Sequence, residues 1–318
     1  MARSRAIPVL VLLGLLAIAS MVAFMTVGAK GRWDFILPFR GAKLAAMLLV
    51  AYSIAVSTVL FQTITNNRIL TPSIMGFDAL YMLIQTVVVF FFGAAQFAAV
   101  GPNVMFLMEV AVMVTFSGLL YRWLLSGEVR SLHLLMLVGI VFGVLFRSLS
   151  NLMQRMIDPN EFTTLQDRFF ASFNTIHTEL LLLATAAVLA VTIVGWRRLH
   201  SFDVIALGRE NAINLGVAHK RAVTVILVLV TILVSVSTAL VGPVTFFGLL
   251  VANLAYQIAG TSRHSVVLPT AILLAIICLV AGQMVLERVF AFNTALSVII
   301  EFLGGITFIV LLLRRSVR

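Results

Sequence analysis

The stretch RAVTVILVLVTILVSVSTALV, residues 221–241, has no charged residue after Arg221 and is followed at once by Gly242-Pro243. An apolar run of about 20 residues can cross the hydrocarbon core of a bilayer as one helix. The whole chain has this character, because 62% of its 318 residues are hydrophobic, 11% are charged and the mean hydropathy is +1.13. Soluble domains average about 45–50% apolar and about 25% charged residues. The sequence therefore predicts an all-α membrane protein and excludes a large soluble catalytic domain.

Similar apolar windows recur along the chain and predict a polytopic bundle of about ten transmembrane helices in a single domain, 1–318. The first window is too long for the apolar part of a signal peptide, so we expect it to be retained. The single cysteine, Cys278, lies within an apolar run and excludes disulfides and cysteine-based metal sites. The expected spans are 7–27, 44–65, 74–93, 100–121, 132–154, 177–195, 221–241, 246–260, 266–287 and 296–313.

The basic residues indicate the orientation of these spans. An even number of spans places both termini on one side, and 14 of the 22 Lys and Arg residues then fall on that side. Because basic residues collect on cytoplasmic loops, we expect both termini in the cytoplasm, and the net charge of +10 does not call for a nucleic-acid partner. Trp33, Trp123 and Trp196 fall at predicted span ends, as interfacial tryptophans do.

The segment between the sixth and seventh spans, residues 196–221, is polar but carries apolar residues at intervals. This pattern predicts short amphipathic helices that divide at Gly208 and end at Gly216, because glycine accepts backbone angles that other residues resist. Such a segment can lie on the membrane surface or dock into a groove of a partner protein. Its spacing leaves both possibilities open.

Sequence signals of catalysis are missing. The chain has no G-x-x-x-x-G-K-[ST] phosphate loop and no H-E-x-x-H, so it is not expected to bind ATP in that way or to hold that type of zinc site. The histidines are scattered and mostly sit at span ends, which disfavours a haem or metal centre. We therefore expect a protein that is not an enzyme, with no catalytic residue, cofactor or metal. The five histidines are His133, His177, His200, His219 and His264.

Five ionisable residues fall within the predicted spans: Asp78, Glu109, Arg147, Glu287 and Glu301. Charges inside a membrane are costly and face either the protein interior or another charge. Proton-coupled transport needs carboxylates of this kind. An ion- or proton-coupled secondary transporter therefore stays open as an alternative function.

Gly242-Pro243, followed by Gly248, predicts a broken or tightly turned backbone at membrane depth. Such breaks are tolerated only where they are buried in protein or line a cavity. An ordinary turn between two helices is the alternative to an element beside the pore.

Four local patterns occur together along the chain. Residues 40–62 begin Arg40-Gly-Ala-Lys43 and resemble an R-x-P-R helix that ends in Gln, and residues 67–76 resemble an N-P-L-A-x-P-x-x-L-G turn. Residues 206–217 are similar to A-L-G-x-x-x-A-x-x-L-G-V, the most specific of the four, and residues 242–249 are similar to G-P-I-x-F-V-G-L. Together these patterns resemble the FecCD-type iron-siderophore permeases of bacterial ABC importers, which are relatives of the cobalamin permease.

Some positions depart from the pattern of that family. Arg68 stands where proline is usual, and residues 252–256 replace a P-H-x-x-R pattern. The usual Asp near Gln283 is missing, although Arg288 remains. These changes bear on the outer gate and the substrate preference, and they fit one member of a non-identical permease pair.

The resemblance implies the permease of a type II ABC importer, which moves a ferric siderophore across the bacterial inner membrane by alternating access. The implied partners are separate ABC ATPase subunits, a periplasmic siderophore-binding protein, a second permease subunit of the same or different sequence, and membrane lipid. The segment 203–217 would couple to the ATPase. The expected coupling residues are Ala206, Leu207, Gly208, Arg209, Glu210, Ala212, Leu215, Gly216 and Val217.

Two further sets of residues follow from the same resemblance. We expect Arg32, Arg40 and Lys43 to dock the binding protein through its carboxylates, and anchoring to lipid headgroups is the alternative. The residues expected to form the translocation path or gate are Gln62, Asn67, Gly242, Pro243 and Gly248. Import of cobalamin or haem by the same fold stays open, as does a membrane anchor subunit of an enzyme complex, which would more naturally show haem-spaced histidine pairs. The sequence does not identify the chelate.

Overall fold

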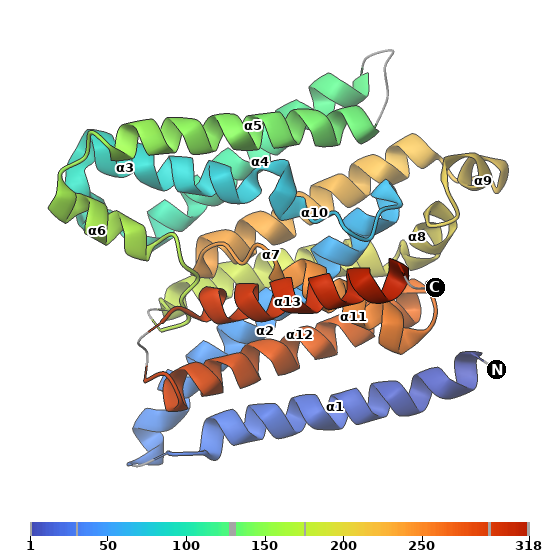
Figure 1. Ribbon diagram of the computed structural model, residues 1–318, viewed down its shortest axis with the longest axis horizontal. Coiled ribbons are helices and arrows are strands. Elements are labelled where there is room, and N and C mark those ends of the chain that lie inside the picture. The colour runs from blue at the N-terminus through green and yellow to red at the C-terminus, as the bar shows by residue number, and fades with distance from the viewer. Residues whose placement is uncertain (1, 30, 127–131, 175, 292–293, 317–318) are drawn as a thin grey trace.

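The computed structural model describes residues 2–29, 31–126, 132–174, 176–291 and 294–316, and within them it contains helices and no strand (Figure 1). Lys30, Arg130 and Arg318, which enter the charge count above, lie outside the described residues. The helices are α1 (Ala2–Thr26), α2 (Trp33–Thr65), the 3-10 helix η1 (Pro72–Met75), α3 (Phe77–Ala99), α4 (Pro102–Ser126), α5 (Leu132–Gln154), α6 (Pro159–Asp167), α7 (Thr178–Trp196), α8 (Leu199–Ile205), α9 (Arg209–Asn214), α10 (His219–Val241), α11 (Phe247–Ala259), α12 (His264–Arg288) and α13 (Leu296–Ser316).

Each of the ten predicted spans coincides with a helix. In the part of the chain that the structure describes, seven helices are long and apolar enough to cross a membrane: α1, α2, α4, α5, α7, α10 and α12. The other three, α3, α11 and α13, contain shorter apolar stretches, Phe77–Gly93, Phe247–Ala259 and Leu296–Ile306. The all-α membrane fold is thus confirmed.

The two largest differences from the sequence prediction are an early helix start and an additional helix. The helix α2 begins at Trp33 and not at residue 44, because its first turns carry charged residues and Pro38, which hide them from an apolar window. The short helix α6 was not predicted at all. Its start has a recognisable signal, since Asp158 Oδ1 accepts a hydrogen bond from Asn160 N at 2.8 Å and Pro159 occupies the first helical position.

The helices α2 and α10 form the centre of the bundle. In their apolar windows 67% and 72% of the residues are buried, against 17% in α1 and 22% in α7. The helix α2 packs against α7, α10, α11 and α12. Ala46, Ala51 and Ala55 of α2 are fully buried. Such small residues allow the close contact on which helix association in lipid depends, because the hydrophobic effect does not drive helices together there.

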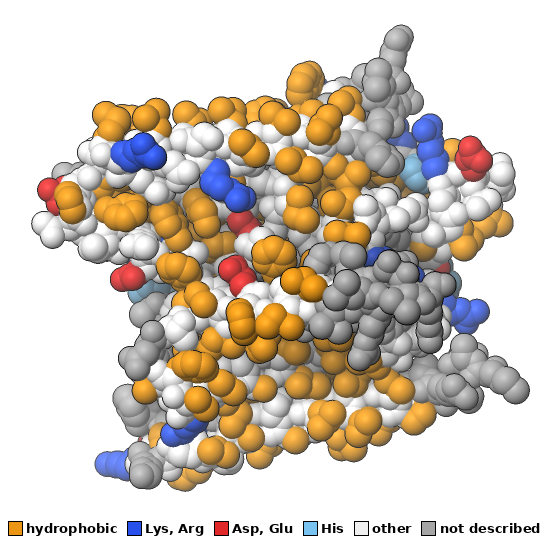
Figure 2. All heavy atoms as spheres, in the orientation of Figure 1, with side chains coloured by type: hydrophobic (Ala, Val, Ile, Leu, Met, Phe, Trp, Pro, Cys, Tyr) orange, Lys and Arg blue, Asp and Glu red, His pale blue; other side chains and the backbone are white. Residues whose placement is uncertain are grey.

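The bundle has two distinct ends. Figure 1 shows α6 at one end, called the outer end below, and α8 and α9 at the other, called the inner end. The beginning of α1 and the end of α13 both lie at the inner end, which agrees with the expected common side for the termini. Figure 2 shows hydrophobic side chains along the flanks, while charged side chains gather toward the two ends, with a small group near the middle of this face.

The turn before α3 is held against the middle of α5 by two glycines. Gly76 has a φ of +91°, a conformation that favours glycine. A Cβ atom on Gly76 would lie 2.9 Å from the Cα of Gly143 in α5, which is too close for any side chain. This contact places the start of α3, including Asp78, beside the part of α5 that carries Arg147.

Candidate functional site

The inner-end segment contains two short helices, as the sequence predicts. The helices α8 and α9 are separated by Gly208, whose φ is +96°, and α9 is followed by Gly216, whose φ is +80°. The turn after α9 closes through a hydrogen bond from Val217 N to Ala212 O at 3.0 Å. Glycine at both positions allows a sharp change of direction that L-residues resist. The result is a compact helix pair outside the spans.

The apolar side chains of this helix pair fall into two groups. Phe202 and Ile205 of α8 are each 1% exposed and pack toward the bundle. Leu207, Ile213 and Leu215 are 57%, 51% and 62% exposed. The helix α8 therefore faces the spans, while the segment around α9 presents an apolar surface at the inner end.

The predicted gate residues Gln62 and Asn67 also lie at the inner end, where α2 ends. Gln62 is 3% exposed, and its Nε2 donates to Arg68 O at 2.8 Å. Asn67 Oδ1 accepts from Ile69 N at 2.9 Å, which closes a tight turn. The guanidinium of Arg68 lies 4.4 Å above the ring of Tyr256 at the end of α11. These contacts tie the turn after α2 to α11.

The other three predicted gate residues, Gly242, Pro243 and Gly248, lie together where α10 passes into α11. The 13 residues of α11 span only about 20 Å, less than the hydrocarbon core of about 30 Å, so α11 alone is too short to cross the membrane. Gly242 has a φ of +97°. A Cβ atom on Gly248 would collide with the hydroxyl of Thr58 in α2. The backbone is thus broken at the predicted position and is packed against protein.

A small polar cavity of about 20 Å³ borders this turn. It has room for about one water molecule. Asp78 is 4% exposed and accepts a hydrogen bond from Thr245 Oγ1 at 2.8 Å. Asp78 therefore has a hydrogen-bond partner inside the protein. The hydroxyl groups that line the cavity belong to Ser57, Thr58, Thr71, Ser73, Ser237, Thr238 and Thr245.

The middle of one flank carries charge. Arg147 of α5 is exposed, as are Ser148 and Asn151 on nearby turns of the same helix. Asp78 lies within electrostatic range of both Arg147 and the half-buried Glu301 of α13. Figure 2 shows acidic and basic side chains near the middle of this face, between apolar flanks. Because an exposed charge at this depth is costly against lipid, the face suits a water-filled path or a protein partner.

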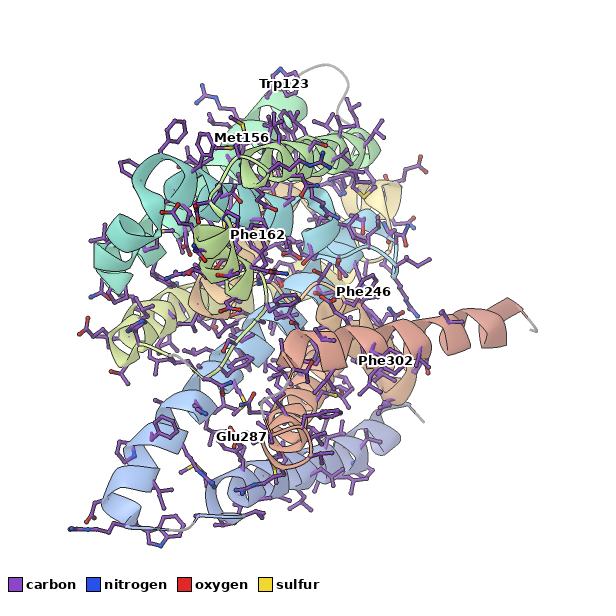
Figure 3. The ribbon with its side chains drawn as sticks, turned by 60° about the vertical axis from the view of Figure 1, so that its left-hand side comes forward. Trp123, Met156, Phe162, Phe246, Glu287 and Phe302 are labelled. Atoms are coloured by element: carbon purple, nitrogen blue, oxygen red, sulfur yellow. The ribbon has the colours of Figure 1, made fainter. Side chains whose placement is uncertain are left out.

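Large apolar side chains are exposed on the same side of the bundle. Phe246, just before α11, and Phe302 of α13 are 45% and 68% exposed, and Figure 3 shows them on neighbouring elements. The backbone of α13 passes close to Phe246 at Gly304. Aromatic side chains are enriched in the cores of protein interfaces, so these two are compatible with contact to another subunit as well as to lipid.

The three basic residues expected to dock a binding protein lie in different surroundings at the outer end. The side chain of Arg32 is 88% exposed and lies 3.5 Å from Asp34. The guanidinium of Arg40 instead donates to carbonyl oxygens at the end of α1, at 2.8 Å to Phe24 O and 3.0 Å to Val27 O. Lys43 is 5% exposed. The structure does not bring the three together on one exposed surface.

Lys43 belongs to a buried polar cluster between α2 and α12. Its Nζ lies 3.3 Å from Glu287 Oε1 and 3.1 Å from Asn174 Oδ1. The Nε2 of Gln283 donates to the same two oxygens, at 3.0 Å and 3.1 Å. Figure 3 shows Glu287 near the outer end of α12. Glu287, an intramembrane charge in the sequence, is therefore half of an ion pair.

A large cavity of about 960 Å³ opens at the outer end, and its walls come from α3, α4, α6, α7, α10, α12, α13 and the segment between α6 and α7. Its polar lining includes Gln85, Glu109, Arg168 and His177. Gln85 Nε2 donates to Glu109 Oε1 at 2.6 Å, and Glu109 is 3% exposed. No spacing in the sequence predicts this cavity, because its walls come from segments far apart in the chain.

Sequence reasoning also missed the contact between α8 and the spans. Asp203 of α8 lies within hydrogen-bond distance of His264, the first residue of α12. The position of His264 at the start of a span was the only signal in the sequence. Asp203 and His264 are 61 residues apart in the sequence, so their pairing can be seen only in the folded chain.

Comparisons with known proteins agree on one family. A sequence model of the FecCD transport family matches residues 6–314. The petrobactin import system permease protein YclO of Bacillus subtilis is 53% identical over 286 residues, which cover 90% of this chain and 91% of that protein. The petrobactin import system permease protein FatC of Bacillus anthracis is 40% identical over 272 residues, covering 86% of this chain and 77% of that protein.

A solved structure has the same fold. It is a metal-chelate type ABC transporter in an inward-facing conformation, with a TM-score of 0.85 and 22% sequence identity. The match covers 96% of this chain and 99% of that one. At this identity the likeness concerns the fold alone.

Proposed function

The chain belongs to the FecCD transport family, and we propose that it is the membrane-spanning permease subunit of an ABC importer for a ferric siderophore of the petrobactin class. The substrate class is supported by 53% identity, over 90% of the chain, to a relative named as a petrobactin permease. The chain has no phosphate loop, so ATP hydrolysis is assigned to separate subunits. The permease itself makes and breaks no covalent bond.

The observation that carries this proposal is the exposed apolar surface around α9, where Leu207, Ile213 and Leu215 are each more than half exposed. Arg209 and Glu210 stand beside them and are also exposed. A short rigid helix with apolar and charged side chains fits a groove on a protein partner. On this proposal the segment 203–217 docks into the ATPase, and the inner end of the bundle is cytoplasmic.

The outer end receives a binding protein that delivers the chelate. Arg32, with its exposed guanidinium, is the residue suited to steer a partner that carries carboxylates. Arg40 and Lys43 serve docking indirectly, because they hold the outer ends of α1, α2 and α12 in place. The cavity of about 960 Å³ lies at this same end.

The translocation path follows the flank that carries Arg147, Phe246 and Phe302, with a second permease subunit on the other side. Ferric catecholates and hydroxamates are bulky and often anionic, and an exposed Arg147 would attract such a chelate. The turn at Gly242, Pro243 and Gly248 and the inner turn at Gln62 and Asn67 are proposed as gate elements. Alternating access follows if movement at the inner end opens one side of this flank at a time.

The test is transport by the purified complex. The chain is co-expressed with its neighbouring transport subunits, and co-purification of an ATPase and a second permease is measured. The complex is then placed in liposomes with ATP inside and binding protein outside. Uptake is followed with radioactive iron in petrobactin, in a hydroxamate siderophore and in haem, and with radioactive cobalt in cobalamin. ATP-dependent uptake of ferric petrobactin supports the proposal.

Two other results would contradict it. Uptake that needs a proton or sodium gradient and no ATPase would favour the secondary transporter, with its dependence on an intramembrane carboxylate such as Glu301. ATP-dependent uptake of haem or cobalamin without ferric petrobactin would keep the importer and change its substrate.

A further inference from the structure

A chain of hydrogen bonds at the inner end joins α8 to two spans. Oδ1 of Asp203 in α8 accepts from the backbone N of His264 at 2.7 Å and lies 2.7 Å from Nδ1 of the same residue's ring. Nε2 of that ring lies 2.8 Å from Oγ1 of Thr63 in α2. These three residues are called the Asp203–His264–Thr63 link below.

The centre of the link is shielded from water. His264 is 2% exposed and Thr63 is 4% exposed. The ring of Phe202, itself 1% exposed, packs against the imidazole with the centroids 6.0 Å apart. Hydrogen bonds are stronger where water is excluded, and a buried ring nitrogen without a partner is unfavourable. The imidazole is therefore held firmly between Asp203 and Thr63.

The link also completes the N-terminus of α12. The first backbone N–H groups of a helix have no partner within the helix, and Arg263 at the N-cap provides no side-chain cap. Asp203 accepts from one of these N–H groups, that of His264, across a tertiary contact. A carboxylate at this position is also favoured by the helix dipole. The start of α12 therefore depends on the position of α8.

The other end of the link reaches the central helix of the bundle. Thr63 lies in the last turn of α2, and its Oγ1 is also 2.8 Å from Val59 O in the turn before. The helix α2 packs in turn against α7, α10, α11 and α12. A displacement of α8 would thus act on the first residue of α12 and the last turn of α2 at the same time.

The two short helices divide the contacts between them. The helix α8 packs against α2, α10 and α12, whereas α9 packs against α8 and α10, buries Ala212 and exposes Ile213. A force received by α9 therefore reaches the start of α12 through α8, and it reaches α2 both through α8 and through α10.

We propose that the Asp203–His264–Thr63 link transmits movement of the coupling segment to α2 and α12, an inference that rests on the proposed function. The three residues act as positioning residues, since they sit between α8 and the spans. When the link is broken, the ATPase still docks on α9 and still hydrolyses ATP, but less of that hydrolysis drives import.

The test measures ATP hydrolysis and uptake of ferric petrobactin labelled with radioactive iron in the same liposomes, with the complete complex and its binding protein. For Asp203→Ala and Thr63→Val we expect the ATP hydrolysed per iron imported to rise about tenfold, the order expected for loss of a buried hydrogen bond. Asp203→Asn keeps the accepting oxygen and Thr63→Ser keeps the hydroxyl, so both should stay close to the unmodified ratio. A purely structural role would lower the amount of complex without changing this ratio.

Thr192→Val is the matched control. Thr192 Oγ1 of α7 donates to Tyr52 Oη of α2 at 2.7 Å, so this variant removes a hydroxyl contact of the same helix at a site away from α8. We expect it to leave the ratio unchanged. The double variant Asp203→Ala/Thr63→Val should be no worse than the worse single variant, because both act through His264.

Three results would overturn the proposal: an unchanged ratio in assembled Thr63→Val and Asp203→Ala complexes, equal losses in Thr63→Val and Thr63→Ser, or losses that multiply in the double variant. If Asp203→Ala does not assemble, the pair Thr63→Val and Thr63→Ser decides. Failure of the unmodified complex to show ATP-dependent uptake would instead count against the proposed function.

Discussion

The inner and outer ends of the bundle both carry residues that the sequence assigns to contacts with other proteins, and the fold treats them in opposite ways. At the inner end Leu207, Ile213 and Leu215 are exposed, as a docking surface requires. At the outer end Lys43 is 5% exposed and ion-paired with Glu287, while Arg40 is bonded to carbonyl oxygens of α1. Arg32 alone of the three predicted docking residues has a side chain that is almost fully exposed.

This difference shows where the local sequence is sufficient to predict that a side chain is exposed. Between Gly208 and Gly216 the chain forms a helix too short to bury more than one side, so an apolar residue on its outer side stays exposed. Lys43 lies on a helix that begins about three turns earlier than its apolar window indicates, and there α12 and the loop before α7 surround it. A long cationic side chain in such surroundings finds its partner within the chain.

The largest expected effect is that a thiol reagent on one side of the membrane labels one end of the bundle and not the other. In a Cys278→Ala background, Asn160→Cys in α6 and Asn214→Cys in α9 each place one exposed thiol at one end. A membrane-impermeant thiol reagent added from outside should label the first fully and the second only after lysis. Labelling of both from the same side would invalidate the assignment of the inner and outer ends.

The next effect tests the buried ion pair of the outer end. Lys43→Met leaves the Glu287 carboxylate buried without its cation, so we expect the folded state to lose about 3–5 kcal/mol. Unfolding of the purified protein in detergent measures the loss, and adding Glu287→Gln should recover most of it. Arg32→Met is the control and should unfold like the unmodified protein. Equal destabilisation by Lys43→Met and Arg32→Met would contradict the difference drawn between the two residues.

At the exposed apolar surface of the inner end, a substitution should lower transport and leave the stability of the protein unchanged. Leu215→Asp places a charge in the proposed groove of the ATPase, and we expect uptake and substrate-stimulated ATP hydrolysis to fall about tenfold or more, with unfolding unchanged. Gly208→Pro should act in the same direction, because proline cannot adopt a φ of +96°. The neighbouring Asn214→Asp is the matched control. Normal stimulated ATP hydrolysis and uptake in Leu215→Asp would remove the coupling assignment and most of the case for an ABC importer.

The smallest effect is expected at Arg32. Arg32→Glu should slow association with the binding protein by a factor of about two to ten at low salt, and the difference should shrink at high salt because exposed charges are screened. Surface-bound binding protein and permease in nanodiscs give the rate directly. An unchanged rate at low salt would assign Arg32 to contacts with lipid headgroups.

Much of the fold could be predicted from the sequence because its signals are local. A span is an apolar run of fixed minimum length, and the division between α8 and α9 depends on glycines that lie within the segment itself. The helix break at Gly242-Pro243 could also be predicted, because glycine followed by proline interrupts a helix through the local sequence alone. The partners of Asp78, Lys43 and His264 could not be predicted, because each lies on a segment of the chain that is far away in sequence and that no spacing rule reaches.

By itself the sequence determined that this protein is a membrane-crossing helical bundle, where its spans lie and that a short helix pair follows the sixth of them. The spans depend on the transfer of continuous apolar runs from water to lipid, and the helix pair depends on its glycines. Both are properties of residues that are neighbours in the chain. Only the tertiary structure decided which charged groups face the outside and which are satisfied inside, as in the pairing of Lys43 with Glu287 and of Asp203 with His264. The reason is that a charge within the protein is stabilised by whichever donor or acceptor the packing of helices brings within about 3 Å, and that partner can come from any part of the chain.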